Sequence, residues 1–256
     1  MLKDYIDIYY FSGTGNTLVI TQEVAKVLCE HGKTVSLLPI ETSDPTKINI
    51  EHSIGFAFPV AIFATYPFVW EFFEKLPQGR GTVAFMLDTL AGFSGGIVSP
   101  LKKLLCKKHY IPLGAKEFIM PSNYGKIAPN EKNEAKKERA LKKAKQYAES
   151  LLAGKTNWRY IPILPALIHQ LSKLKIAWRK MGGQITIDQT RCTKCGLCAK
   201  LCPVKNITIE EGAFPKKGDR CYSCMRCVAF CPANAILFRG KQNRYRAVKC
   251  EAFLEQ

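Results

Sequence analysis

What this sequence lacks excludes several broad classes of protein. One long stretch without charge, residues 54–70, is interrupted by Pro59 and Pro67 and is shorter than the roughly 20 apolar residues of a membrane-spanning helix. The first four residues lead directly into an apolar segment, without the pattern of a signal peptide. We therefore expect neither a membrane span nor a cleaved leader.

Acidic residues and histidines are also scarce. The chain has 21 Asp and Glu against 38 Lys and Arg, a formal net charge of +17 at pH 7, and only 4 histidines, which are scattered. No constellation of acid, base or nucleophile stands out. Such a charge attracts acidic proteins, anionic lipid or nucleic acid. Interleaved aromatic platforms for bases are missing, so we expect an acidic protein partner and no nucleic acid.

What the sequence does contain is eight cysteines in two runs of identical spacing, C-x2-C-x2-C-x3-C-P. The runs are Cys192, Cys195, Cys198 and Cys202 before Pro203, and Cys221, Cys224, Cys227 and Cys231 before Pro232. Structural zinc usually pairs two C-x2-C hooks across a longer insert, and disulfides suit small secreted domains. The doubled run instead predicts iron–sulfur ligands. Cys29 and Cys106, outside the runs, are expected to be core residues on helices.

The two runs resemble those of bacterial two-cluster ferredoxins. In that family three cysteines of a run hold one 4Fe-4S cube and the fourth reaches the other cube. The resemblance implies one cluster on Cys192, Cys195, Cys198 and Cys231 and a second on Cys221, Cys224, Cys227 and Cys202. Cluster assembly needs reduced thiols, so we expect the protein in the cytoplasm.

A second motif lies near the N-terminus. Residues 5–11 are rich in β-branched and aromatic residues and predict a buried strand, and Leu18 opens an apolar pattern of helical spacing. The loop between them is Ser12, Gly13, Thr14, Gly15, Asn16 and Thr17. It lacks the Walker lysine, and Leu18 stands where a dinucleotide fingerprint needs its last glycine. Such a hydroxyl-rich loop before a helix predicts an anion site, and an ordinary strand–helix turn is the alternative.

The loop resembles the flavodoxin phosphate loop, (Ser/Thr)-x-Thr-Gly-(Asn/Ser)-Thr, at every position. This resemblance implies that it holds the phosphate of FMN. In flavodoxins two further loops surround the isoalloxazine ring. The matching residues here are Pro59, Val60, Ala61, Ile62 and Phe63, and Thr89, Leu90, Ala91, Gly92 and Phe93. Phe63, Tyr66 and Phe93 are candidates to stack on the ring, and ordinary packing is the alternative for each.

Strands and helices alternate through the first 153 residues. Strands are predicted at 5–11, 34–38, 53–58, 82–88 and 116–120, and further helices at 66–76, 97–110 and 131–153. This order predicts an α/β fold with a flavodoxin-like, five-stranded, parallel, doubly wound sheet. The expected division is a flavodoxin-like FMN-binding domain at 1–153, a basic amphipathic linker at 154–182, and a small α+β two-cluster ferredoxin domain with a C-terminal tail at 183–256.

The linker carries an apolar stripe. Within residues 157–181 the stripe includes Trp158 and Trp178, and Lys and Arg line the other side. One interpretation is a segment that docks the two domains onto each other. The other is an interfacial helix that rests on an anionic membrane.

Over residues 1–153 and 183–240 the chain resembles the flavodoxin–ferredoxin fusion proteins of anaerobes. The family implies single-electron transfer between FMN and two 4Fe-4S clusters, which links a low-potential donor to a partner reductase. The alternative is an FMN-dependent oxidoreductase that directly reduces a small molecule such as a quinone. The positive net charge is a departure, because flavodoxins and small ferredoxins are usually acidic.

Overall fold

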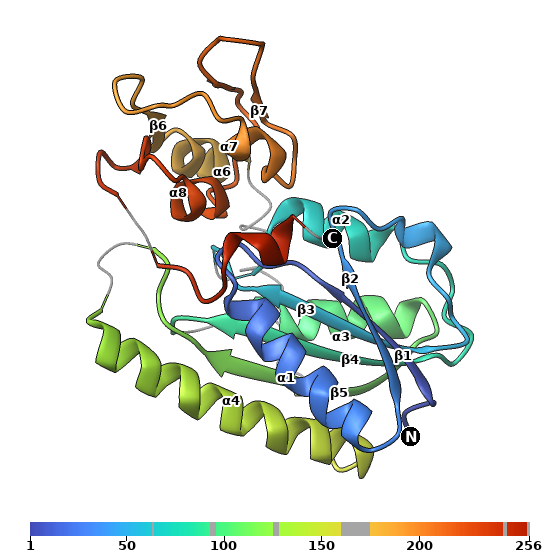
Figure 1. Cartoon of the computed structure of the whole chain (residues 1–256). Helices are drawn as coiled ribbons and strands as arrows, with labels where there is room; N and C mark the ends of the chain where they lie inside the picture. The colour runs from blue at the N-terminus through green and yellow to red at the C-terminus, as the bar shows by residue number, and fades with distance from the viewer. Residues whose placement is uncertain (63, 93–95, 125–127, 160–174, 243–244, 255–256) are drawn as a thin grey trace. The chain divides into compact units, whose positions relative to one another are not determined.

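The computed structural model describes residues 1–62, 64–92, 96–124, 128–159, 175–242 and 245–254 (Figure 1). It divides the chain into two compact units. The first unit is Met1–Ser12, Asn16–Pro121 and Ala128–Lys173, and the second is Gly13–Gly15, Ser122–Ile127 and Leu174–Gln256.

The first unit is built on one parallel sheet in the order β2-β1-β3-β4-β5. Its strands are β1 (Tyr5–Tyr10), β2 (Thr34–Pro39), β3 (Ser53–Pro59), β4 (Val83–Leu90) and β5 (Ile111–Ile119). This is the flavodoxin-like strand order, in which the direction of progression reverses between β1 and β3. The predicted fold class is therefore confirmed.

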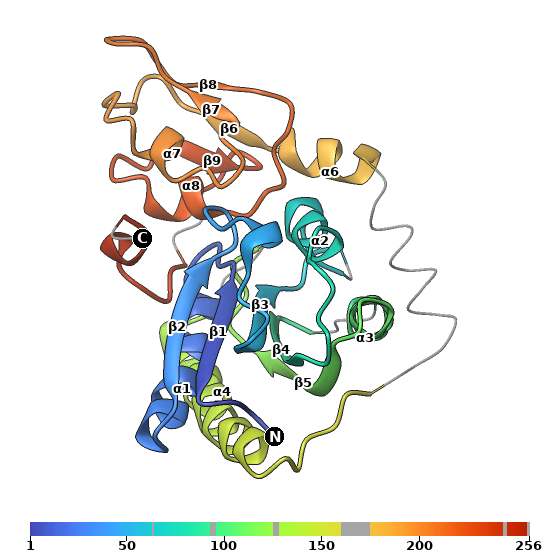
Figure 2. The same cartoon turned by 90° about the vertical axis from the view of Figure 1, so that its right-hand side faces the viewer.

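Helices cover both faces of this sheet. They are α1 (Asn16–Glu30), α2 (Pro67–Glu74), α3 (Val98–Lys107) and α4 (Asn130–Leu152), and a short 3-10 helix, η1 (Pro45–Lys47), follows β2. Figure 2 shows α1 and α4 on one face and α2 and α3 on the other. Phe56 and Phe58 of β3 both pack against Phe73 of α2, and Phe118 of β5 meets Tyr147 of α4. Apolar side chains from both sides of each central strand therefore form two core layers.

Strand β5 begins earlier than the pattern predicted. The sequence suggested a start near residue 116, because Pro112 and Gly114 weaken a strand. β5 is an edge strand, where proline is tolerated because one side of the strand needs no ladder hydrogen bond. A Cβ on Gly114 would lie 2.6 Å from Cβ of Thr156, and the Thr156 hydroxyl donates to the Leu113 carbonyl at 2.8 Å. Glycine is needed there because the chain beyond α4 runs close along this edge.

One carboxyl group is sealed inside this unit. Asp88 of β4 is fully buried, and neither side-chain oxygen has a hydrogen-bond partner among the described residues. Burial, with a smaller contribution from Glu117 on β5, raises the pKa of Asp88 well above its ordinary value.

The second unit is a small α+β fold, as predicted. Its elements are α6 (Lys175–Gly182), β6 (Ile185–Ile187), α7 (Leu197–Lys200), β7 (Ile207–Thr208), β8 (Lys216–Lys217), α8 (Arg226–Phe230), β9 (Ile236–Phe238) and η2 (Cys250–Phe253). Strand β6 pairs with β9 and β7 with β8, both antiparallel. The core is Ile185, Ile207, Met225, Cys227, Val228, Ile236 and Phe238. A core of this size is marginal for a fold that stands alone, so we expect bound metal to contribute to its stability.

The ends of the predicted linker stripe are buried in different units. The indole N–H of Trp158 donates to the Val98 carbonyl at 2.9 Å in the first unit, and Trp178 lies edge-on to Tyr222 in the second. Residues 160–174, the middle of the stripe, lie outside the described residues. Among the helices that are described, none is long and apolar enough to cross a membrane.

The expectation that Cys29 and Cys106 are core residues is wrong, since both are exposed. Each follows a fully buried leucine, Leu28 or Leu105, and one residue further along a helix turns the side chain about 100° away from the core.

Candidate functional site

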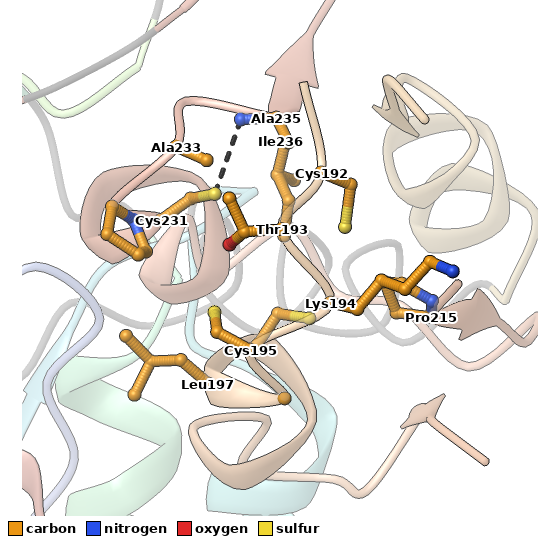
Figure 3. A pocket seen from close by; sticks show the side chains of 13 residues that line it. Cys192, Thr193, Lys194, Cys195, Leu197, Pro215, Cys231, Ala233, Ala235 and Ile236 are labelled. Carbon is orange, nitrogen blue, oxygen red and sulfur yellow. Dashed lines mark hydrogen bonds between the residues drawn. The ribbon is translucent and has the colours of Figure 1, made fainter. Parts of the chain in front are cut away.

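Four cysteines from both runs line one hollow in the second unit (Figure 3). They are Cys192, Cys195, Cys198 and Cys231, and the lining also includes Lys194, Leu197 and Ile236. Burial, and then the neighbouring thiols of Cys195, Cys231 and Cys192, raise the pKa of Cys198 to about 11. Cys231, the last cysteine of the second run, therefore lies with the first three cysteines of the first run.

The other four cysteines form a second, more deeply buried group. Burial raises the pKa of Cys221 above its ordinary value. It raises the pKa of Cys224 to about 12 and the pKa of Cys227 well above its ordinary value. The Cys202 thiol is near enough to add to all three shifts. The cysteines of each set that the ferredoxin resemblance implied are therefore neighbours in the structure, and their division between two clusters stays a prediction.

These donor sets fit iron–sulfur cubes. A thiol kept protonated by burial becomes a thiolate when a metal supplies positive charge. Among the described residues no three His, Cys, Asp or Glu side chains are placed to hold a single metal ion. In a cube the four thiolates bind four different irons, so their sulfurs need not converge on one point.

The predicted anion loop follows β1 and leads into α1. Gly15 has φ of 100°, which favours glycine, and α1 begins at the next residue. The Ser12 hydroxyl accepts from the Leu18 N–H at 3.3 Å, and the Thr17 and Thr89 hydroxyls share a buried hydrogen bond of 2.8 Å. The first turn of α1 carries no acidic residue. Hydroxyls and a helix N-terminus whose first turn has no acidic residue suit a phosphate group.

Two residues after β5 hold this loop in place. Asn16 donates from its side-chain amide to the Pro121 carbonyl at 2.8 Å in the first unit. In the second unit, which includes Gly13–Gly15, the Asn123 amide donates to the Thr14 hydroxyl at 3.0 Å. No local sequence pattern indicated that Asn123 contacts the loop.

The loops predicted to surround the flavin ring follow the neighbouring strands β3 and β4. The Val60 N–H donates to the Thr89 carbonyl at 2.8 Å and joins the two loops. Ile62 has φ of 47°, which is strained for a β-branched residue and is often found at ligand sites.

The predicted stacking rings have different outcomes. Phe63 and Phe93 lie outside the described residues. Tyr66 is buried, with its ring edge-on to Phe11 and stacked on Phe68. The alternative of ordinary packing therefore describes Tyr66.

Comparison with known families identifies the second unit. Residues 184–232 match the model of the 4Fe-4S dicluster domain, and this stretch contains all eight cysteines of the two runs. The chain joins a flavodoxin-like fold to a 4Fe-4S dicluster domain. Clusters of this kind carry single electrons, so the chain has an electron-transfer role.

Solved structures similar to part of this chain include several flavodoxins. A short-chain flavodoxin associated with a PDU bacterial microcompartment is 15% identical with a TM-score of 0.45, over 61% of this chain and 100% of that one. Flavodoxin from Streptococcus pneumoniae TIGR4 is 16% identical with a TM-score of 0.43, over 58% of this chain and 98% of that one. Megasphaera elsdenii flavodoxin is 20% identical with a TM-score of 0.39, over 56% of this chain and 98% of that one. All three TM-scores are below 0.5, and the fold assignment rests on the strand order. No curated protein matches.

The repeat in the dicluster domain extends to its backbone. Residues at three equivalent pairs of positions have positive φ: Lys194 and Ser223, Gly196 and Met225, and Lys205 and Asn234. Gly196 and Met225 directly precede α7 and α8, which carry the third cysteine of each run. Left-handed residues let so short a loop curl around one centre. Only one of these six residues is glycine, so the sequence carried little signal of the geometry.

Backbone N–H groups also reach the fourth cysteine of each run at equivalent positions in the dicluster domain. Asn206 donates to Sγ of Cys202 at 3.2 Å, and Ala235 to Sγ of Cys231 at 3.3 Å. Such bonds stabilise thiolate charge and tune the reduction potential of a bound cluster. Their equivalence in the two halves means that they do not distinguish one set from the other.

Proposed function

We propose that the chain passes single electrons between FMN and two 4Fe-4S clusters, and links a low-potential donor to a partner reductase. The crossed grouping of the eight thiols, four and four, is the observation that supports this most directly. When bound, FMN takes up two electrons and each cube exchanges one.

In this proposal each thiol set holds one cube. The first is Cys192, Cys195, Cys198 and Cys231, and the second is Cys202, Cys221, Cys224 and Cys227. The chain supplies thiolates and partly excludes water from the second set, where Cys227 is a core residue. The backbone N–H groups at Asn206 and Ala235 stabilise the negative charge on sulfur.

The flavodoxin-like fold would hold FMN at the carboxyl ends of β1, β3 and β4, beside the reversal in strand order. The hydroxyl-rich loop 12–17 binds the phosphate through backbone N–H groups and hydroxyls. Backbone groups of residues 59–62 and 89–92 border the ring. The strained backbone at Ile62 and the Val60–Thr89 hydrogen bond support the proposal that these two loops are already ordered for the flavin ring.

We also propose that acidic redox proteins dock beside the first thiol set. Cys195 is exposed and belongs to a loop with exposed Thr193 and Lys194, whereas Cys227 of the second set is buried. Electron exchange requires close approach of the partner, and the positive net charge of the chain would steer an acidic protein.

The test is anaerobic reconstitution of the full chain. We expect about eight irons per chain and a bound yellow flavin, and reduced chain should pass electrons to an acidic carrier faster at low than at high salt. Much less iron, or no FMN binding, would contradict the proposal. Turnover of a quinone without any protein partner would favour the oxidoreductase alternative.

A further inference from the structure

A hairpin between the two cysteine runs forms part of the first thiol site. Strands β7 and β8 pair antiparallel, and residues 209–215 connect them. Pro215, at the end of this connection, is buried and lines the hollow of the first thiol set (Figure 3). The other described residues that line this hollow lie within 192–198 or 231–236. The hairpin therefore supplies one wall of the hollow, while Cys195 remains exposed.

One lysine of the first run holds the connecting segment of this hairpin. Nζ of Lys194 donates to the Gly212 carbonyl at 2.6 Å and lies 4.5 Å from the centre of the Phe214 ring. A charged donor makes a stronger hydrogen bond than a neutral one, and an ammonium group is further attracted to the face of an aromatic ring. Lys194 directly precedes Cys195. Its side chain thus fixes Gly212 and Phe214, and with them Pro215, relative to the first run.

The base of the hairpin is held independently of Lys194. Asn206 is buried, its side-chain amide donates to the Gly218 carbonyl at 3.2 Å, and its side-chain oxygen accepts from the Arg220 N–H at 2.8 Å. The Gly218 N–H donates to the Asn206 carbonyl at 2.8 Å. Loss of the Lys194 contacts should therefore free residues 209–215 and leave the strands that anchor them in place.

The two halves of the cysteine repeat differ at the position of this lysine. Ser223 is the equivalent residue in the second run, and both residues are left-handed, with φ of 58° at Lys194 and 51° at Ser223. Ser223 is uncharged and buried, whereas Lys194 is exposed and reaches the hairpin. The contact made by Lys194 therefore distinguishes the first thiol set from the second.

We propose that Lys194 is a positioning residue that holds segment 209–215 beside the first cluster and limits the access of water to it. This rests on the proposed function, in which the first thiol set holds a cube. Lys194 acts through the Gly212 carbonyl and the Phe214 ring, which place the wall at Pro215. Solvent exposure is one of the properties that set the potential of a cluster, and an open site also gives a chelator access to iron.

The test follows the release of iron to a chelator from the reconstituted full chain under anaerobic conditions. Lys194→Met keeps a long side chain without the charged donor. We expect about half of the iron, that of one cube, to leave roughly three to ten times faster than in the wild type, as the loss of one hydrogen bond implies. The other half should leave at the wild-type rate. Lys194→Arg keeps a charged donor that can lie over Phe214, and should release iron as the wild type does.

Two further variants separate the contact from the charge. Phe214→Leu keeps the lysine and its charge but removes the ring, so the fast phase should appear there too. Lys205→Met removes the same charge from another exposed, left-handed position and should leave both phases unchanged. Water near the clusters is measured as deuterium coupling in EPR of the reduced chain in D2O. This coupling should increase in Lys194→Met and Phe214→Leu and stay at the wild-type level in Lys205→Met.

The iron content of every sample is measured before these experiments. Unchanged iron release and unchanged deuterium coupling in Lys194→Met and Phe214→Leu chains with full iron content would overturn this inference and leave the proposed function intact. Faster release of all the iron would overturn it as well, because Lys194 would then support the whole domain. A wild-type chain that holds no clusters would instead overturn the proposed function.

Discussion

The side-chain oxygens of Thr17 and Thr89 lie 2.8 Å apart in a hydrogen bond sealed from solvent. Thr17 belongs to the first turn of α1 and Thr89 to the end of β4, so the bond joins two of the three loops at the proposed flavin edge. The carbonyl of Thr89 accepts from Val60 of the third loop. Thr89 is therefore the residue through which all three loops are held in register.

Removal of either hydroxyl should weaken this frame. We expect Thr89→Val to lower the free energy of unfolding by about 1–3 kcal/mol, because the Thr17 hydroxyl is left buried without its partner. FMN affinity, measured by quenching of flavin fluorescence, should fall as well. The double variant Thr17→Val with Thr89→Val should cost less than the sum of the two single changes. Thr34→Val, at an exposed position, is the matched control.

Asp88 should make stability fall as pH rises. Its folded-state pKa lies above its unfolded-state pKa, so the folded chain binds the extra proton and loses stability from about pH 4 up to the folded-state pKa. The limiting slope is about 1.4 kcal/mol per pH unit. Between pH 5.5 and 8.5 we expect the wild type to lose stability relative to Asp88→Asn in urea denaturation.

The exposed Asp44 provides the control for that experiment. Hydrogen bonds from Thr46 lower its pKa, so it contributes stability above its unfolded-state pKa and loses it only in acid. The free energy of unfolding of Asp44→Asn should therefore change with pH in parallel with that of the wild type from pH 5.5 to 8.5. Parallel curves for Asp88→Asn would show that Asp88 does not titrate differently in the folded and unfolded chains.

The crossed thiol sets predict an unusual pattern for paired cysteine variants. Cys198 and Cys231 lie in different runs but one set, so Cys198→Ala with Cys231→Ala should leave about four irons per chain. Cys198 and Cys202 lie in one run but different sets, so Cys198→Ala with Cys202→Ala should leave almost none. Cys29→Ala with Cys106→Ala should keep the full iron content. Four irons in the second pair and none in the first would refute the crossing.

The left-handed residue Lys205 should respond to glycine in the opposite direction from a helical lysine. Lys205 is exposed and has φ of 49°, so Lys205→Gly relieves backbone strain and should stabilise the second unit by about 0.5–1 kcal/mol. Lys200 is exposed but lies in helix α7, so Lys200→Gly should destabilise the second unit by a similar amount. The readout is the rate at which a chelator removes iron. Equal effects of the two changes would contradict the conformational argument.

The sequence predicted most of the sheet, because apolar runs of strand length alternate with helical patterns and reveal a parallel α/β fold. It placed the start of β5 too late, since Pro112 and Gly114 are unfavourable in a strand unless the strand lies at an edge, and edge position is a property of the whole sheet. Tyr66 illustrates the same limit. Its position suggested a flavin contact, but the ring packs with Phe11 and Phe68, and only tertiary structure distinguishes the two.

For the candidate site, cysteine spacing and family resemblance together anticipated which thiols gather, while the charge environment could not be read from spacing. Arg191, Arg220 and Arg226 look alike in sequence, yet only Arg226 is buried. Its burial depends on Phe253, far along the chain, and no local pattern announces that contact. Asp88 likewise follows an ordinary strand pattern, and nothing in its neighbours marks a buried carboxyl group.

The exchange of Cys231 and Cys202 between the two runs also bears on how the protein matures. Under the proposed ligation neither cube can acquire its full complement of thiolates from the first run alone, because one needs Cys231 and the other needs three cysteines that follow residue 220. Almost the entire domain must therefore leave the ribosome before either cluster can have all four of its thiolate ligands. Maturation is in this sense a late and joint event, and a break in the chain between the runs would deprive both cubes of ligands at once.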